Sequence, residues 1–173
     1  MKGAATILSI FLLSLPGGCH QVRHGLATLR GTAPHSAIDG TAVFTQTETG
    51  VKARVKLEGA PPGVHGIHIH EHGNCGDMGK TAGGHFNPAG VKHGFLPKDG
   101  MAGAHAGDMG NITIRADGSG VLNLELPGLT LDQGPHGIIG RSVILHEKVD
   151  DFGQPTGNAG GRIACGVIEE PGR

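Results

Sequence analysis

Short stretches in which apolar and polar residues alternate with a period of two recur along the chain. Such alternation is typical of β-strands that bury one face, and residues 51–58 (VKARVKLE) show it clearly. Glycine-bearing turns, such as Asp39-Gly40 and Asp117-Gly118, separate most of the stretches. The pattern predicts an antiparallel all-β sandwich or barrel. The predicted strands are 25–32, 40–47, 51–58, 64–71, 111–115, 121–126, 142–147 and 163–168.

Two long segments, 72–110 and 149–161, interrupt this alternation. Loops of such length are uncommon in compact domains unless they have a function. The first segment is rich in glycine and has little apolar content from which to build a core of its own. A bound metal ion can order such a loop, because ligand binding supplies free energy that apolar contacts do not. We therefore expect a functional loop, and the residues it contains that could bind metal include His85, His93, His105 and Asp108, beside His72.

The N-terminus has the layout of a secretory signal peptide. Lys2 precedes an apolar block at 4–15, and small residues follow before Cys19. The block is shorter than the ~20 residues that a transmembrane helix needs, so we predict no membrane span. We divide the chain into a signal peptide (1–19), a mobile N-terminal tail (20–30) that overlaps the first predicted strand, and one domain (31–173).

The three cysteines divide into one near the signal peptide and two within the domain. Cys19 directly follows small residues, as the lipid-modified cysteine of bacterial lipoproteins does; acylation of Cys19 and ordinary cleavage nearby both stay open. We expect export to the periplasm or cell envelope. Cys75 and Cys165 form a single pair, which favours one disulfide in an oxidising compartment over two unrelated buried thiols.

Charge and composition narrow the class of protein. The formal net charge is −1, which provides no basic surface for nucleic acid. The 33 glycines, five phenylalanines and absence of tryptophan and tyrosine suit many turns and disfavour a large aromatic core. Histidine is unusually frequent, at twelve residues, many of them between positions 65 and 105. The composition therefore favours a metal-binding protein over a nucleic-acid-binding one.

Histidines also occur on the predicted strands. His68 and His70 lie two residues apart in GIHIHEHG, so both imidazoles face the same side of a strand. Imidazole suits copper and zinc, and a strand holds such a pair rigidly. His146 ends the apolar run SVILH, where an isolated histidine would usually be a core or strand-end residue. Downstream of the strand pair, three nitrogen donors and one carboxylate form a set that resembles a tetrahedral zinc site: His85, His93, His105 and Asp108.

Five sequence segments together resemble the signatures of the copper/zinc superoxide dismutases. They are HGIHIHEHGNC, GGHFNP, HAGDMGN, ILHEKVDD and NAGGRIACGVI, and they occur in the family's order across residues 31–168. The resemblance implies an eight-stranded Greek-key sandwich or barrel of immunoglobulin-like architecture. It also implies an enzyme that disproportionates superoxide to dioxygen and hydrogen peroxide by alternating Cu(II) and Cu(I). A structural zinc would share a bridging histidine with the copper.

The same resemblance assigns roles to individual residues. Asp150 matches the carboxylate that links a copper ligand to a zinc ligand, here His68 and His93. Arg162 matches the arginine that attracts the anionic substrate, and His85 the bridging residue that delivers a proton. The family disulfide corresponds to Cys75 and Cys165. The implied copper ligands are His68, His70, His85 and His146, and the implied zinc ligands are His85, His93, His105 and Asp108.

Some features depart from the family pattern or lie outside it. The loop at 149–161 is shorter than in the animal enzymes and lacks their charged run, so steering of superoxide is expected from Lys148, Lys92 or other basic residues. Extra residues in the metal loop leave the subunit contact open, with a homodimer as one expectation. His65 matches a position that braces backbone, His136 matches a surface position, and no role is assigned to His20, His24 or His72. A metal-binding module without turnover and a purely structural sandwich are the alternative functions.

Overall fold

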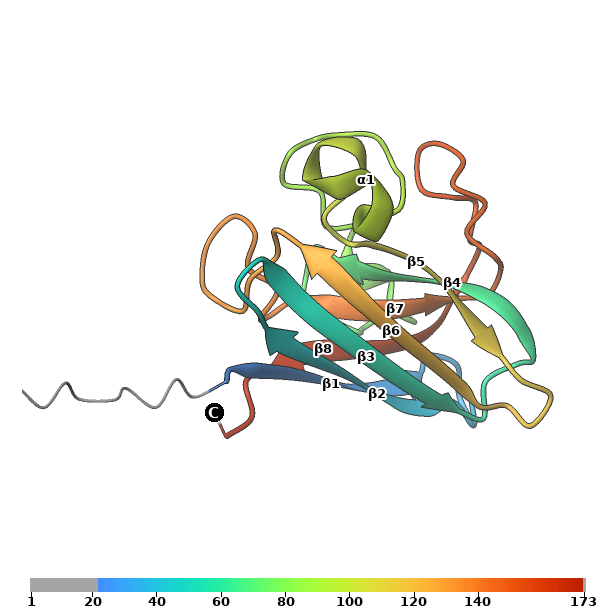
Figure 1. Cartoon of the computed structure of the whole chain (residues 1–173). Helices are drawn as coiled ribbons and strands as arrows, with labels where there is room; N and C mark the ends of the chain where they lie inside the picture. The colour runs from blue at the N-terminus through green and yellow to red at the C-terminus, as the bar shows by residue number, and fades with distance from the viewer. Residues whose placement is uncertain (1–21, 173) are drawn as a thin grey trace, which may run out of the picture.

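The computed structural model describes residues 22–172, which form a β-barrel with long loops at one end (Figure 1). The predicted signal peptide, Cys19 and His20 lie outside the described residues. The eight predicted strands are all present. They are β1 (His24–Gly31), β2 (Asp39–Gln46), β3 (Gly50–Glu58), β4 (Gly63–His70), β5 (Asp108–Ile114), β6 (Gly120–Pro127), β7 (Ser142–His146) and β8 (Arg162–Glu169).

β1 extends further toward the N-terminus than the predicted domain boundary. Residues 24–30, which the sequence analysis also assigned to a mobile tail, belong to this strand. The physical reason is burial, because Ala27 and Leu29 are fully inside the core while Thr28 and Arg30 face solvent. Alternation was therefore the better guide to this segment than its proximity to the signal peptide.

The strands close into a barrel in the order β1-β2-β3-β6-β5-β4-β7-β8. Every pairing is antiparallel, and closure occurs where β1 pairs with β8 as well as with β2. The crossovers from β3 to β6 and from β4 to β7 place strands distant in sequence next to one another (Figure 1). The predicted all-β antiparallel fold is thus confirmed.

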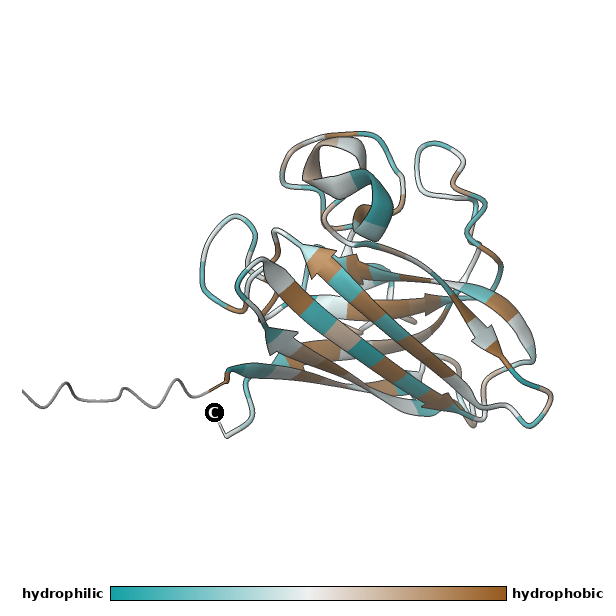
Figure 2. Ribbon diagram, viewed as in Figure 1, coloured by the Kyte–Doolittle hydropathy of each residue, from teal (hydrophilic) through white to brown (hydrophobic). Residues whose placement is uncertain are grey.

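The core fills the inside of the barrel with aliphatic side chains. On β3, Val51, Ala53, Val55 and Leu57 are buried and the residues between them are exposed, which Figure 2 shows as stripes across the strand. Full burial of a side chain such as leucine stabilises a fold by about 1.5–3 kcal/mol. Among residues 22–172, Phe44 is the one fully buried phenylalanine, in line with the low aromatic content.

β4 is buried on both faces from His65 to His70, and its partner strand β7 is buried over its whole length. Ile67 and Ile69 face the barrel core. The opposite face is covered by the connections at 71–107 and 147–161, which correspond to the two predicted functional loops. A register shift between Gly66 and His68 places His68 opposite Asp108 on β5.

The long connection between β4 and β5 contains two short helical segments, η1 (Lys80–Ala82) and α1 (Leu96–Gly103). Pro97 stands in the first turn of α1, a position that proline tolerates. Gly100 interrupts the helix with a φ of 65°. Within residues 22–172, no helix has the length and apolar character required to span a membrane.

Candidate metal centre

Two adjacent strands supply three of the predicted ligands. His68 and His70 are two residues apart on β4, and His146 ends β7, which pairs with β4. All three side chains are buried. Nε2 of His70 and Nε2 of His146 are 3.3 Å apart although the residues are 76 positions apart in sequence. The barrel itself therefore brings these imidazoles to one point.

His85 joins these three histidines from the long loop. Its ring centroid is 4.0 Å from that of His68 and 5.0 Å from that of His70. One ring nitrogen of each histidine lies within 4.8 Å of the others. We call His68, His70, His85 and His146 the strand group.

Hydrogen bonds fix how two members of the strand group are turned. Nδ1 of His70 donates to the carbonyl of Gly83 at 3.0 Å, and Nδ1 of His146 donates to the carbonyl of Gly160 at 3.3 Å. Because a carbonyl only accepts, the proton of each neutral ring stays on Nδ1. Each Nε2 then presents a lone pair to the centre of the group.

Burial keeps the strand group neutral. It lowers the pKa of His68 to about 4, of His70 to about 2 and of His146 to about 3, because a charged ring loses its hydration inside the protein. The pKa of His85 is lowered for the same reason. Neighbouring imidazoles contribute further lowering, since each disfavours a second positive charge nearby. At neutral pH these rings are in the form that binds metal.

A second group forms around Asp108, the first residue of β5. Its carboxylate oxygens lie 2.9 Å from Nδ1 of His85, 2.9 Å from Nδ1 of His93 and 3.1 Å from Nδ1 of His105. Backbone N–H groups of Gly94 and His105 also donate to this carboxylate. We call His85, His93, His105 and Asp108 the loop group; all four are buried and their donor atoms lie within 4.8 Å of one another.

Carboxylates set the protonation of the loop group. Burial would lower the pKa of His93, but the carboxylates of Asp108 and Asp150 outweigh it and raise that pKa to about 9. Burial would raise the pKa of Asp108, but its contacts with His105, His85 and His93 hold it far below the usual range. The carboxylate is therefore ionised and His93 is protonated at neutral pH in the metal-free protein.

Asp150 connects the two groups. One carboxylate oxygen accepts from Nε2 of His68 at 2.8 Å, and the other accepts from Nε2 of His93 at 2.9 Å. This is the pair of histidines that the sequence resemblance implied. Such a contact fixes the ring orientation and tautomer, leaving Nδ1 of both rings free to face a metal. Burial opposes ionisation of Asp150, yet the two histidines hold its pKa below the usual range.

Two further residues keep Asp150 in place. The side-chain amide of Asn111 donates to the carbonyl of Asp150 at 2.9 Å and accepts from its backbone N–H at 2.8 Å. Gly157 packs over the carboxylate with a φ of 75°. A Cβ atom at Gly157 would lie 1.8 Å from Oδ1 of Asp150 and 2.7 Å from Nε2 of His93. Only glycine fits there without displacing the contact between Asp150 and His93.

Three buried nitrogens in the two groups have no hydrogen-bond partner: Nδ1 of His68, His93 and His105. A buried polar atom without a partner costs about 1–3 kcal/mol, so such atoms require an explanation. Nδ1 of His93 and His105 lies close to Asp108 but is not aligned for a hydrogen bond. A metal ion at the centre of each group would satisfy all three. Four imidazoles suit copper, and three imidazoles with one carboxylate suit zinc, so the residues present fit both ions.

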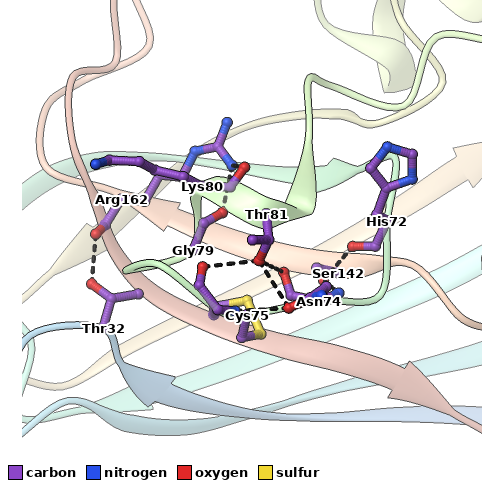
Figure 3. Close-up of a disulfide and its surroundings, with 11 residues drawn as sticks. Thr32, His72, Asn74, Cys75, Gly79, Lys80, Thr81, Ser142 and Arg162 are labelled. Carbon is purple, nitrogen blue, oxygen red and sulfur yellow. Dashed lines mark hydrogen bonds between the residues drawn. A yellow bond between two sulfur atoms is a disulfide. The ribbon is translucent and has the colours of Figure 1, made fainter.

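A pocket of about 200 Å³ opens onto the strand group. Arg162, the first residue of β8, lines it and donates to the carbonyl of Gly79 at 2.5 Å (Figure 3). It also donates to the carbonyl of Gly83 at 2.5 Å. These partners are uncharged, so the guanidinium keeps its positive charge for a ligand in the pocket. The lining residues are His70, Gly84, His85, His146, Thr156, Asn158, Ala159, Gly160 and Arg162.

A disulfide joins Cys75 to Cys165, with 5.7 Å between the Cα atoms, and confirms the predicted bond (Figure 3). Cys165 lies on β8, three residues after Arg162, and Cys75 begins the loop whose carbonyls hold the guanidinium. Thr81 closes the same loop through a hydrogen bond of 2.8 Å to the side chain of Asn74. The disulfide therefore fixes Arg162 relative to the carbonyls that accept its hydrogen bonds.

The remaining described histidines lie outside both groups. His65 is buried and its ring contacts the carbonyls of Pro61 and His146, each at 2.9 Å, so it braces backbone as its sequence position implied. His72 is exposed, with its ring 4.0 Å from the carboxylate of Glu71. His24, His35 and His136 are also exposed. The structure therefore places none of these rings at the metal centre.

Sequence reasoning did not identify several residues that shape the site. Thr156 and Asn158 line the pocket, and Asn111 and Gly157 position Asp150. Asn111 stands in the quoted segment HAGDMGN and Gly157 in a glycine-containing loop, but neither is a ligand by chemistry. The side chain of Gln154 forms hydrogen bonds to the backbone of His93, and no sequence motif includes Gln154.

Comparisons with known proteins agree with this geometry. The family model for copper/zinc superoxide dismutase matches residues 38–168. A solved structure titled "Crystal Structure Analysis of the clock protein EA4" is 40% identical, covers 86% of this chain and 94% of its own, and superposes with a TM-score of 0.75. The family is one of oxidoreductases that bind copper and zinc. Since the family model covers well over half of the chain and includes strands β2 to β7 and nearly all of β8, the chain belongs to the copper/zinc superoxide dismutase family.

Proposed function

We propose that this protein disproportionates superoxide to dioxygen and hydrogen peroxide, with copper held by the strand group and zinc by the loop group. The observation that carries the proposal is the position of His85. It belongs to both groups, it is buried, and it lines the pocket beside Arg162. His85 is shared by two sets of metal-binding residues, and the pocket that it lines also contains the guanidinium of Arg162, which bonds only to uncharged carbonyls. This arrangement suits a redox site for a small anion.

The assignment of ligand atoms follows from the hydrogen bonds around each ring. Nε2 of His68 is bound to Asp150, which leaves Nδ1 for copper. Nδ1 of His70 and of His146 is bound to a carbonyl, which leaves Nε2. Nδ1 of His85 faces Asp108 and would bind zinc, so its Nε2 is left for copper.

The zinc site would use the carboxylate of Asp108 with Nδ1 of His85, His93 and His105. Three neutral nitrogens and one negative oxygen match the tetrahedral donor set of structural zinc. The site is buried and all its positions are filled by protein atoms, so it has no place for substrate. We therefore assign it an ordering role.

Arg162 would attract superoxide and orient it in the pocket. The guanidinium is protonated at any accessible pH, and its bonds to the carbonyls of Gly79 and Gly83 hold it in one place. A fixed positive charge raises the local concentration of a small anion, and salt weakens this effect over distance. Lys148 and Lys92 are exposed and are the further candidates for steering.

Turnover consumes two superoxide ions and two protons and produces one dioxygen and one hydrogen peroxide. Copper, when bound, supplies the reversible one-electron exchange. We assign His85 the delivery of one proton to the second superoxide, because this ring lines the pocket; Nε2 would carry that proton only while it is not bound to copper. Its Nδ1 stays on the side of Asp108, which keeps the ring in position while Nε2 gains and loses the proton. Water entering the pocket supplies the second proton.

Reconstitution of the purified protein tests the proposal. Superoxide consumption is measured for the metal-free, copper-only, zinc-only and doubly loaded protein, with metal content determined in parallel. We expect one copper and one zinc per chain, activity only where copper is bound, and recovery on adding copper back. His136→Ala, at an exposed histidine, is the control and should match the unsubstituted protein. Equal activity in the metal-free protein would sink the assignment.

We also propose export, with the domain tethered through lipid on Cys19. The disulfide between Cys75 and Cys165 is consistent with an oxidising compartment, and residues 1–21 lie outside the described structure. Mass spectrometry of the native N-terminus tests the tether: an acylated Cys19 supports it, and an unmodified chain beginning after Cys19 contradicts it. A homodimer is our further expectation, which sedimentation of the mature protein would test.

A further inference from the structure

One residue of the loop at 147–161 holds the backbone of His93 at both of its polar groups. Oε1 of Gln154 accepts from the backbone N–H of His93 at 3.1 Å, and Nε2 of Gln154 donates to the carbonyl of His93 at 2.9 Å. The two residues are 61 positions apart in sequence. Because one side-chain amide both accepts from and donates to the backbone of His93, it fixes the peptide groups on either side of this residue.

Two other residues of the same loop contact His93. Asp150 accepts from Nε2 of its ring, and Phe152 lies along the ring face with centroids 6.3 Å apart and an interplanar angle of 21°. Phe152 is 44% exposed and has a φ of 59°, which is unfavourable for a bulky side chain. Its backbone N–H donates to Asp150 at 2.8 Å, which holds it there. Alternate residues of one short segment thus grip the ring edge, ring face and backbone of His93.

The same segment continues into the wall of the pocket. Thr156, Asn158, Ala159 and Gly160 line it beside Arg162. Only one residue separates Gln154 from Thr156, the first residue of this segment that lines the pocket. A displacement of Gln154 would therefore also displace the pocket wall. The position of His93 and the shape of the pocket are therefore linked through this amide.

We propose that Gln154 is a positioning residue that clamps His93 for zinc binding and transmits the order of the loop group to the pocket wall. The proposal rests on the zinc site proposed above. With zinc bound, His93 would be immobile, and the amide would hold residues 156–160 against the pocket. Without zinc, the clamp would join two loops that are both free to move, so it would add little order.

Zinc release into excess chelator, measured on protein loaded with both metals, tests the clamp. Gln154→Ala should release zinc about tenfold faster, within the range seen when groups supporting a metal ligand are lost, while copper release stays within about twofold. Gln154→Met keeps the volume of the side chain and removes both hydrogen bonds, so it should behave as Gln154→Ala does. Gln133→Ala, at an exposed glutamine between β6 and β7, is the matched control.

Hydrogen exchange supplies the second readout. Residues 156–160 should exchange faster in Gln154→Met than in the unsubstituted protein when zinc is bound, and at equal rates when zinc is absent. Zinc release at the unsubstituted rate in Gln154→Met would overturn the clamp and assign the residue to packing alone. If the unsubstituted protein binds no zinc, the proposed zinc site fails instead, so the two failures are distinguishable.

Discussion

The strand group and the loop group reach similar geometry by different physical means. Members of the strand group on β4 and β7 are placed by the packing of the barrel, where Ile67, Ile69 and Leu145 are fully buried beside them. No carboxylate belongs to that group, and burial together with the neighbouring imidazoles keeps its rings neutral. The loop group has no strand pairing to place His93 or His105. It depends on Asp108 and Asp150 instead.

The two groups therefore differ in whether a metal ion must displace a proton when it binds. The strand group is preorganised and already deprotonated at neutral pH, so copper would enter without displacing protons. The loop group is held together in the metal-free protein by ion pairs, with the pKa of His93 raised to about 9. Zinc would have to replace a proton there, and in return would add order to a loop that contributes only a few side chains, such as Phe86 and Leu96, to the barrel core.

The largest effects should follow from removing one ligand of each group. His70→Ala should reduce superoxide consumption to background and abolish copper binding while zinc is retained. His105→Ala should abolish zinc binding and lower the melting temperature more than His70→Ala does, while part of the copper-dependent activity remains. Metal analysis, activity and thermal unfolding check both variants. His72→Ala is the control, since that ring is exposed; full activity in His70→Ala would contradict the division into two groups.

The disulfide should matter more to the loop side of the molecule than to the barrel. Replacing Cys75 and Cys165 together by alanine should lower the free energy of unfolding by about 2–4 kcal/mol, because the bond closes a long loop in the unfolded chain. Urea unfolding of the metal-free protein measures this. Zinc release should also become faster, with copper release less affected. An unchanged free energy of unfolding would show that the bond does not stabilise the fold.

Arg162 stands at the pocket over the strand group but is not a ligand, so its variants should separate rate from metal content. Replacing Arg162 by Ile should lower the bimolecular rate with superoxide by roughly tenfold while both metals stay bound. The expected order of rates is Arg, Lys, Ile, Glu, since Lys restores the charge without the planar fork and Glu repels the anion. Stopped-flow kinetics at low and high salt measure it. A wild-type rate in the doubly loaded Ile variant would assign Arg162 to the solvated surface.

The smallest expected effect is on the pH dependence of the stability of the metal-free protein. Titration of the strand group lowers stability at acid pH, and titration of His93 in the loop group lowers it at alkaline pH. The pKa of His68 is about 4, below the ~6.5 of an unfolded histidine, so stability is lost as pH falls below about 6.5 because the unfolded chain binds more protons. The pKa of His93 is about 9, so its contribution is present below about 6.5 and is lost as pH rises through 9. Urea unfolding at pH 5, 7 and 9.5 should therefore show a maximum near pH 7. His93→Gln should remove the alkaline decline; a decline that persists would contradict this origin.

The barrel could be predicted because its determinants are local. The alternation along β3 indicates which face is buried before any partner strand is known, and the glycine-bearing turns indicate where strands end. The donor residues were also visible, since His68 and His70 share a strand face and the motif segments assign the others. Helix α1 was not predicted, because eight residues that include Pro97 and Gly100 carry no helical periodicity.

The supports of the site were beyond sequence reasoning for a different reason. Gln154 and Asn111 are single amides whose partners lie 61 and 39 positions away, and neither belongs to a repeating pattern. What defines them is a two-way hydrogen bond to a backbone brought near only by folding. Gly157 likewise resembles any loop glycine until the Asp150 carboxylate is found in the space a Cβ atom would occupy.

Closure of the barrel also bears on aggregation. Each of the eight strands between residues 22 and 172 has a neighbour on both sides, because β1 pairs with β8. A strand with one side unpaired offers a row of N–H and C=O groups onto which another chain can add, and a closed barrel presents no such row. The register between β5 and β6 comprises the single pair Ile114 and Gly120. These two strands therefore have the least backbone pairing to lose before an edge becomes available to another chain.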